Sequence, residues 1–197
     1  MPEAKQERSK KRIQIILETA EIILLDEGLE SLTIANISKY SGLKRTSTYK
    51  FFPTADSLKE ALIIKYINDC SEYFEEKSYN INTENLSVVI LRYVEILYDY
   101  FQESSSAQII ILKNTVNPPI DSSVIRILST TIQSYIESNI KLPDMHNKDG
   151  IYRVLTQVVI SIFSLNVKES GLLNETGKIE AHRAGHAYMQ NWVNQSS

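Results

Sequence analysis

A run of basic, hydroxyl and aromatic side chains lies between residues 44 and 50 of the 197-residue chain. It comprises Lys44, Arg45, Thr46, Ser47, Thr48, Tyr49 and Lys50, of which all but Thr48 are candidate DNA-binding residues. Arginine and lysine can donate to guanine O6 and N7 or to phosphate, and short hydroxyl side chains can approach a base edge or a thymine methyl group. Tyr49 and Lys50, further along the run, are better placed for the phosphate backbone. These residue types point to recognition of double-stranded DNA rather than to a reaction.

Two short helices joined by a tight turn are needed to present these side chains. Thr33 can cap a first helix that buries Ile37 and ends at Gly42. A second helix follows over 44–50, and Pro53 ends it because proline disfavours helical geometry in the residue before it. This spacing predicts a helix-turn-helix, whose second helix lies in a DNA major groove. Two ordinary core helices could share the glycine turn, but they do not explain a second helix with so little apolar surface.

The charge of the chain is divided unevenly, although its net value of −3 is not typical of a DNA-binding protein. Residues 1–65 carry 11 Lys or Arg against 9 Asp or Glu, a net of +2, whereas 66–197 carry 10 against 15, a net of −5. A basic end on an acidic body suits a protein that turns one face toward phosphate. Within that end, Lys10, Lys11 and Arg12 belong to an N-terminal arm that we expect to bind the DNA backbone or to enter the minor groove.

Nearly every other segment has the apolar spacing of an amphipathic helix, and no segment alternates with period two for long. We therefore predict an all-α fold, with an N-terminal three-helix helix-turn-helix domain followed by a C-terminal helical domain. The helices are expected at about 13–27, 33–42, 44–50, 55–76, 86–101, 107–114, 122–140, 148–169 and 175–194, with a firm corner at Asn117-Pro118-Pro119.

Several classes of protein and site are disfavoured. No apolar run approaches the roughly 20 residues of a membrane span, and the charged N-terminus lacks the apolar core of a signal peptide. The single cysteine, Cys70, fits a reducing compartment, so we expect a cytoplasmic protein that does not bind a membrane. No nucleophile elbow, phosphate-binding glycine loop or HExxH motif is present, so we expect no enzyme activity and no cofactor.

Several residues of the first third of the chain occur together at a recognisable spacing, namely Gly28, Thr33, Ser41-Gly42-Leu43, Tyr49, Phe52 and Leu58. Over residues 10–65 this pattern resembles the DNA-binding domain of TetR-family transcriptional regulators. The resemblance implies a helix-turn-helix DNA-binding domain over 1–54 and a ligand-binding and dimerisation domain over 55–197. It also implies that Thr33 touches phosphate through its hydroxyl and its backbone N–H, helped by the helix dipole.

Two positions depart from the family pattern. Thr46 stands where the family usually has a glycine in the recognition helix, so the base preference cannot be taken from relatives. Ala55 stands where a phosphate-binding lysine often begins the fourth helix. Lys59, one turn later, is a candidate substitute for that lysine.

The acidic two thirds of the chain are rich in aromatic residues, which could line an apolar pocket or simply fill a core. The candidate pocket residues are Tyr73, Tyr93, Leu97, Phe101, Ile110, Tyr135 and Phe163. The resemblance also implies that the last two helices pair with those of a second copy in a four-helix bundle. The candidate dimer-interface residues are Ile151, Leu155, Val158, Val159, Ile162 and Trp192.

The sequence thus favours a homodimeric repressor whose affinity for a palindromic double-stranded DNA operator is controlled by an unknown small molecule. A ligand-independent activator or architectural DNA-binding protein of the same family is an alternative, since a filled tyrosine-rich core has the same composition as a pocket. A third hypothesis, a helical enzyme or metal-dependent sensor, rests on the i, i+4 spacing of His182 and His186. Since no third ligand is convincingly placed, surface or interface histidines are the simpler interpretation, and we expect no metal.

Overall fold

The computed structural model describes residues 2–81, 83, 85–113 and 122–195. Within these residues every regular element is a helix, so the prediction of an all-α fold is confirmed. The elements are α1 (Pro2–Asp26), the 3₁₀ turn η1 (Leu29–Ser31), α2 (Ile34–Ser41), α3 (Arg45–Phe51), α4 (Ala55–Lys77), α5 (Leu86–Glu103), α6 (Ser105–Ala107), the π-helix η2 (Gln108–Lys113), α7 (Ser122–Asn139), α8 (Lys148–Ser170) and α9 (Glu175–Gln195).

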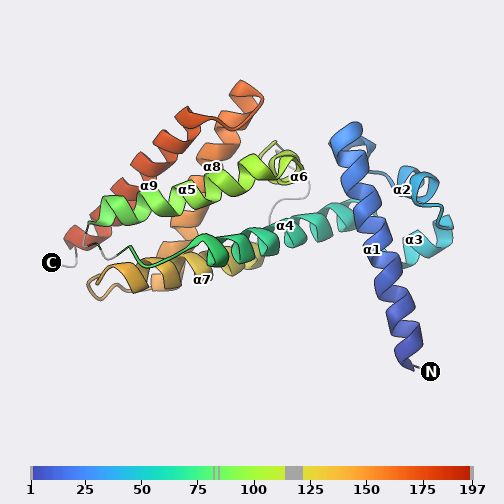
Figure 1. The fold of residues 1–197 in the computed structure, drawn as a ribbon, viewed down its shortest axis with the longest axis horizontal. Coiled ribbons are helices and arrows are strands. Elements are labelled where there is room, and N and C mark those ends of the chain that lie inside the picture. Colours follow the sequence, from blue (N-terminus) through green and yellow to red (C-terminus); the bar gives the residue numbers. More distant parts are fainter. Residues whose placement is uncertain (1, 82, 84, 114–121, 196–197) are drawn as a thin grey trace.

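The helices form two groups joined by one long element. The helices α1, α2 and α3 gather at one end of the molecule, and α4 runs from that end into the second group (Figure 1). There α4 packs against α5 and α7, which in turn pack against α9 and α8. A single cluster of buried apolar side chains extends through both groups. Since α1 also touches α6, the two groups meet at a second place besides α4.

Local hydrogen bonds fix the start of α4. The N–H of Ser57 donates to Thr54 Oγ1 at 3.0 Å, and the N–H of Thr54 donates to Ser57 Oγ at 3.2 Å. Such a capping box satisfies N–H groups that have no acceptor within the helix, and a cap of this kind typically contributes about 1 kcal/mol. These two polar side chains therefore set the point at which the chain leaves α3 and enters the long connecting helix.

The helix α1 is longer than the sequence predicts. The apolar spacing begins at Ile13, but the helix begins at Pro2. Proline is tolerated in the first turn of a helix, and the Ala, Lys, Glu, Gln and Arg residues that follow it are good helix formers. The predicted N-terminal arm with Lys10, Lys11 and Arg12 is therefore a helical extension of α1.

The helix predicted over 107–114 is divided in the structure. The short α6 ends at Ala107, and the π-helix η2 follows at once. Gln108 stands at the junction, where its Nε2 donates to the carbonyl of Phe101 at 2.7 Å and its Oε1 accepts from the N–H of Leu173 at 3.1 Å. The spacing of apolar residues predicts an ordinary helix here, because it contains no information about these side-chain hydrogen bonds. The predicted corner at 117–119 lies outside the described residues.

The helix α9 packs against its neighbours through small residues. Gly177, Ala181 and Gly185 are buried on one face of the helix. A Cβ atom at Gly177 would lie 2.7 Å from Cγ and Oδ1 of Asn166 in α8. Asn166 Oδ1 accepts from the N–H of Asn174 at 2.9 Å, and Asn166 Nδ2 donates to Asn174 Oδ1 at 3.1 Å. The absence of a side chain at 177 thus makes room for the hydrogen bonds that fix the turn between α8 and α9.

One of the described helices, α8, is long and apolar enough by composition to cross a membrane. However, 56% of its most apolar stretch is buried inside the protein. The core helix of a soluble fold meets the same criteria of length and composition. The buried side of α8 packs against α7, α9 and η2.

Candidate nucleic-acid interface

The helix-turn-helix is built by α2, a glycine turn and α3. Thr33 caps α2, because its Oγ1 accepts from the N–H of Asn36 at 3.1 Å. Gly42 ends α2 in the left-handed region, at a φ of 69°, which glycine adopts without a steric penalty. Lys44 then precedes the first residue of α3, Arg45. The cap, the turn glycine and the second helix are all at the positions that the sequence predicts.

Thr48 holds α3 against α2. Its side chain is 0% exposed, and its Oγ1 accepts from Ser38 Oγ at 3.2 Å. By residue type alone, Thr48 does not differ from the exposed polar residues on either side of it. The signal that could have found it is its spacing, since Thr48 lies four residues before the buried Phe52 and so on the same side of the chain.

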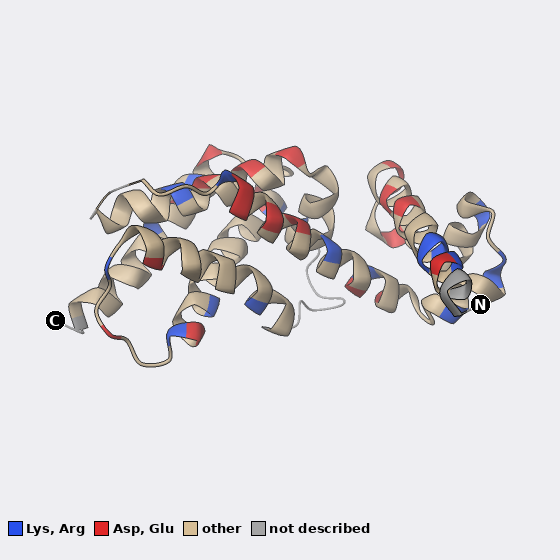
Figure 2. Cartoon of the chain, turned by 60° about the horizontal axis from the view of Figure 1, so that its bottom comes forward, with Lys and Arg blue, Asp and Glu red and all other residues tan. Residues whose placement is uncertain are grey.

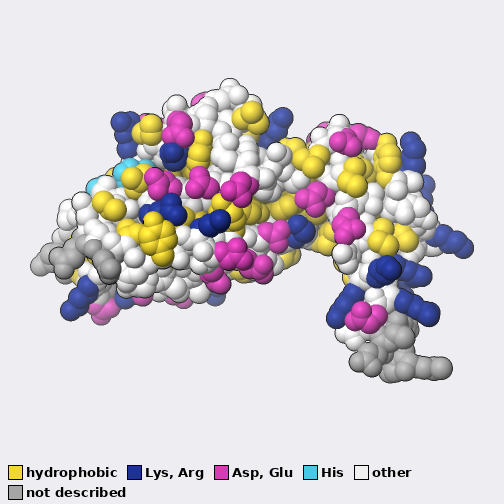
Figure 3. All heavy atoms as spheres, in the orientation of Figure 1, with side chains coloured by type: hydrophobic (Ala, Val, Ile, Leu, Met, Phe, Trp, Pro, Cys, Tyr) yellow, Lys and Arg dark blue, Asp and Glu magenta, His cyan; other side chains and the backbone are white. Residues whose placement is uncertain are grey.

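The predicted DNA-reading side chains lie together on the solvent side of α3. Lys44, Arg45, Thr46, Tyr49 and Lys50 are exposed, and Ser47 is half-buried. Figure 2 shows lysine and arginine along the outer edge of this end of the molecule, and Figure 3 shows their side chains projecting from its surface. The structure therefore leaves five of these six residues accessible to a partner and Ser47 partly accessible.

The electrostatics of α3 favour an anionic partner. Lys44 and Arg45 stand at its N-terminus, where no acidic residue lies in the first turn and no side chain caps the helix. The helix dipole disfavours cations at an N-terminus by about 0.3–1 kcal/mol each. Because an anion beside them would offset this cost, the arrangement is suited to phosphate or to the acceptor-rich edge of a base.

The structure revises the expected phosphate contact at Thr33. The N–H of Thr33 donates to the carbonyl of Ser31 at 2.8 Å, so that group is already occupied. The hydroxyl of Thr33 accepts from Asn36, but its own hydrogen can still be donated. The N–H groups of Ile34 and Ala35, in the first turn of α2, precede the first acceptor within the helix. These two groups are the better candidates for a phosphate at this helix end.

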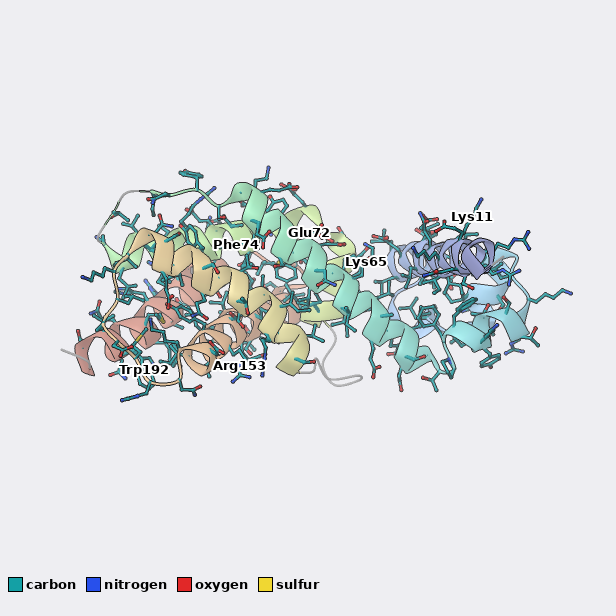
Figure 4. The ribbon with its side chains drawn as sticks, turned by 90° about the horizontal axis from the view of Figure 1, so that it is seen from below. Lys11, Lys65, Glu72, Phe74, Arg153 and Trp192 are labelled. Carbon is teal, nitrogen blue, oxygen red and sulfur yellow. The ribbon has the colours of Figure 1, made fainter. Side chains whose placement is uncertain are left out.

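The other predicted DNA-binding cations lie on α1 and α4. Lys10, Lys11 and Arg12 are exposed on the helical extension of α1, where Figure 4 labels Lys11. By contrast, the side chain of Lys59 is only 14% exposed, and its Nζ lies 3.8 Å from Asp56 Oδ1. Lys59 would have to leave Asp56 to reach a phosphate, so the cations of α1 are better placed.

A polar contact joins α1 to α2. Tyr40 Oη donates to Glu27 Oε1 at 2.5 Å, just beyond the end of α1. This hydrogen bond to a carboxylate is the main cause that raises the pKa of Tyr40. The tyrosine therefore keeps its proton at neutral pH, and the link supports the orientation of the helix-turn-helix relative to α1.

Comparison with known proteins identifies the fold. No protein-family model matches the sequence, and no curated protein matches it significantly. The structure superposes on a TetR-family transcriptional regulator from Streptomyces coelicolor with a TM-score of 0.70 and 14% identity, over 92% of this chain and 99% of that one. A TetR transcriptional regulator from Rhodococcus sp. RHA1 gives a TM-score of 0.71 and 14% identity, over 94% of this chain and 98% of that one. The fold is the TetR-family fold.

The TetR-family fold includes the C-terminal helices, because both superpositions cover nearly the whole chain. The predicted pocket residues of this region lie mainly in its core. Tyr93, Leu97, Phe101, Ile110 and Phe163 are fully buried, Tyr135 is nearly so, and Tyr73 is half-buried. The rings pack directly on one another, as in the edge contact of Phe101 with Phe163, whose centroids are 6.2 Å apart. Of the hollows that the structure shows, one includes Tyr135 in its lining.

Several buried tyrosine hydroxyls in the TetR-like C-terminal helices have no hydrogen-bond partner. They belong to Tyr66, Tyr93, Tyr135 and Tyr152. Burial raises the pKa of all four side chains, so each hydroxyl keeps its proton as a potential donor. A buried donor left unpaired costs about 1–3 kcal/mol, and such groups mark places where a water molecule or a ligand fits.

The predicted dimer-interface residues divide into two sets. Ile151, Leu155 and Val159 are buried in the core of the single chain, where a partner cannot contact them. The others, Val158, Ile162 and Trp192, are half-buried. The large apolar residues that α8 exposes are Val154 and Leu165. The apolar side chains that α8 leaves at least partly accessible therefore include Val154, Val158, Ile162 and Leu165.

His182 contacts α5, and His186 stacks on His182. Their rings stack with centroids 6.1 Å apart. Nε2 of His182 lies 3.1 Å from Ser87 Oγ and 3.0 Å from the carbonyl oxygen of Ser87. Within the part of the chain that the structure describes, no group of three or more His, Cys, Asp or Glu could hold a metal ion. The contact with Ser87 gives His182 a structural role.

Replacing Thr48 with valine should lower the free energy of unfolding by about 1 kcal/mol, because valine cannot accept the hydrogen bond from Ser38. The matched control is Thr46→Val, at an exposed position of the same helix, which should change it by less than about 0.5 kcal/mol. Urea unfolding followed by circular dichroism measures both variants. Equal losses at the two positions would contradict the role given to Thr48.

Proposed function

We propose that this protein is a sequence-specific DNA-binding transcriptional regulator, with a DNA-binding domain over 1–54 and a regulatory domain over 55–197. The observation that carries the proposal is the division of α3 into a buried back, held by Thr48, and an exposed face with Arg45 and Lys50. A core helix has no need of such a face, whereas a helix in the major groove requires one. The TetR-family fold supports the same function, and we place the protein in the cytoplasm.

The residues of the interface have separate roles in this proposal. Lys44 and Arg45 read guanine, and Thr46 and Ser47 approach neighbouring base edges. Tyr49 and Lys50 bind phosphate, together with the N–H groups at the start of α2. Lys10, Lys11 and Arg12 add backbone contacts beyond the major groove, because α1 carries them outside the helix-turn-helix.

The protein is further proposed to bind DNA as a homodimer through α8 and α9. The support is the apolar surface that both helices leave exposed, including Val154, Leu165 and Ile179. A two-fold dimer presents two recognition helices about 34 Å apart and so selects a palindromic operator. Light scattering of the full chain should give twice the 22.5 kDa of one copy. A monomer at all concentrations would contradict this arrangement.

A repressor controlled by a small molecule is the mode of action that we propose. The support is the continuous path from the core to the DNA-binding end, since α4 spans both groups and Tyr100 Oη donates to the carbonyl of Tyr66 in α4 at 2.7 Å. The unpartnered hydroxyl of Tyr135 gives a ligand a polar group to engage. A ligand releases the operator only to the extent that it binds one position of α4 better than another.

A ligand-independent activator or architectural protein is the second candidate. The observation in its favour is the close packing of the predicted pocket residues, such as Phe101 against Phe163. A regulator with a filled core needs no effector to hold the recognition helices in place. The two candidates differ in one measurement, because only the first predicts that a small molecule changes operator affinity.

Fluorescence anisotropy with DNA from the region upstream of the protein's own gene tests the DNA-binding proposal. We expect binding in the range of about 10⁻⁸–10⁻¹¹ M for a specific site, and at least a thousandfold weaker binding to scrambled DNA. The absence of binding at low salt would overturn the proposal, since even non-specific association requires only the basic face.

A further inference from the structure

A hollow lined by polar side chains lies between the C-terminal end of α4 and the helix α7, well away from the proposed DNA interface. Its volume is about 430 Å³, and its lining consists of Glu75, Ser78, Tyr79, Asn80, Thr130, Thr131, Ser134, Tyr135 and Ser138. The two helices run side by side along this part of the molecule (Figure 4). All nine side chains can form hydrogen bonds, so the hollow has the character of a polar binding site rather than of a gap in the core.

The hydroxyl groups of the hollow present acceptors rather than donors. Ser134 Oγ donates to the carbonyl of Thr130 at 3.0 Å, Thr130 Oγ1 to that of Arg126 at 2.9 Å, and Ser138 Oγ to that of Tyr135 at 2.8 Å. Each of these hydroxyl hydrogens is therefore committed to the backbone of α7. The oxygen lone pairs remain available, so a molecule entering the hollow meets a surface that accepts hydrogen bonds.

Glu75 adds negative charge to this surface, and its carboxylate lies beside the hydroxyls of Thr131 and Ser71. Thr131 Oγ1 lies 2.6 Å from Ser71 Oγ and 3.3 Å from Glu75 Oε1. The lining contains one carboxylate, from Glu75, and neither lysine nor arginine. Glu75 disfavours an anionic ligand, Arg92 beside Tyr79 disfavours a cationic one, and the acceptors of the hollow would stabilise a ligand rich in hydroxyl or N–H donors.

Two tyrosines complete the site with an aromatic surface and an unpaired polar group. The side chain of Tyr79 is 62% exposed, and the guanidinium of Arg92 lies over its ring, 5.4 Å from the centroid, so a ligand could pack on the ring face turned away from Arg92. Tyr135 is 5% exposed, and its buried hydroxyl has no hydrogen-bond partner. The wall of the hollow thus includes a residue whose buried hydroxyl can pair with a polar group.

We propose that the hollow between α4 and α7 binds a small neutral polyol of the monosaccharide class. Such a molecule donates several hydrogen bonds, carries no charge to be repelled by Glu75, and packs its C–H face on an aromatic ring. Its size also suits the site, because pockets for small ligands begin at about 300 Å³. The binding site stands independently of the proposed DNA-binding function, although a ligand that joins α4 to α7 would act on the helix that leads to the DNA-binding end.

Saturation-transfer NMR on the full chain tests the proposal with four probes added singly, namely D-glucose, D-galactose, D-ribose and myo-inositol. We expect saturable binding of at least one probe at concentrations up to about 10 mM, which is the weak range typical of a single small ligand. Ser134→Ala should weaken that binding about three- to tenfold by removing one acceptor, and Tyr79→Ala should weaken it at least as much by removing the ring.

Matched controls are available elsewhere on the surface. Ser161→Ala removes an exposed serine from α8, and Tyr40→Ala removes an exposed tyrosine from α2, so neither should change binding of the probe. Two results would overturn the proposal: no saturable binding of any of the four probes, or equal weakening by the control and hollow variants. Tighter binding of spermidine than of every polyol would also overturn it, because the site would then select a cation through Glu75. DNA binding is measured separately and is not required for any of these outcomes.

Discussion

Replacing Arg45 with alanine should weaken specific operator binding by about 1–3 kcal/mol, which is roughly 5- to 150-fold. The reason is the position of Arg45 at the exposed start of α3, where a guanidinium can donate two hydrogen bonds to one guanine. The loss should be confined to DNA that carries the recognised base pair. We therefore also expect discrimination at one operator position to disappear, as measured by anisotropy with a set of singly substituted operators.

Lys50→Ala is the matched comparison, because Lys50 lies on the same exposed face but further along α3. A phosphate contact carries no sequence information, so this variant should weaken binding to all DNA alike and reduce the salt slope by about 1. Lys168→Ala, at an exposed site near the end of α8, should change neither quantity. If Arg45→Ala reduced binding to operator and scrambled DNA equally, the assignment of base reading to Arg45 would be wrong.

Replacing Gly177 with alanine should lower the free energy of unfolding by about 1–3 kcal/mol, although alanine is the better helix former by about 1 kcal/mol. The added Cβ would lie 2.7 Å from Asn166, whose side chain holds Asn174 through two hydrogen bonds. Asn166 must then move, and the buried polar groups of this turn lose their partners. Thermal or urea unfolding of the full chain measures the effect.

Gly185→Ala is the control for this prediction, since it makes the same change in the same helix. A Cβ at Gly185 would lie 3.4 Å from side-chain carbons of Ile90 and Leu155, which is ordinary contact. The higher helix propensity of alanine should therefore outweigh any cost of fitting the added methyl group. We expect the free energy of unfolding to stay the same or to rise by up to about 1 kcal/mol. A destabilised Gly185→Ala together with a neutral Gly177→Ala would show that the space around α9 is not as the structure places it.

The parts of the fold that the sequence predicts well are those determined by local chemistry. Thr33 caps α2 and Gly42 adopts the left-handed turn, because side-chain hydroxyls and glycine have strong preferences of their own at helix ends. The exposed face of α3 is predicted for the same reason, since charged side chains seldom lie in a core. Each of these features can be predicted from a few residues that are adjacent in the sequence.

The features that the sequence does not reveal depend on contacts between distant segments. Thr48 differs from its polar neighbours only through its hydrogen bond with Ser38 in α2, which the sequence does not show. Gln108 stands where α6 gives way to η2, and its hydrogen bonds to Phe101 and Leu173 are likewise not visible in the sequence. The predicted dimer interface shows the same dependence. Periodicity finds an apolar stripe at Ile151 and Leu155 but cannot tell that the chain's own core covers it. The apolar residues that remain accessible to a partner, such as Val154, stand out less in the sequence than the buried stripe does. Only the structure shows which of the two sets is exposed.

The buried and exposed sides of α3 differ in how far a substitution would disturb folding. Thr48 fixes the helix from behind, so changes at Thr46 or Ser47 leave the scaffold intact. A mutation on the outer side therefore alters which DNA is preferred without endangering folding, and most such changes cost less than about 0.5 kcal/mol of stability. Gene duplication followed by drift at a few outward positions can thus yield a regulator with a new target from an unchanged framework.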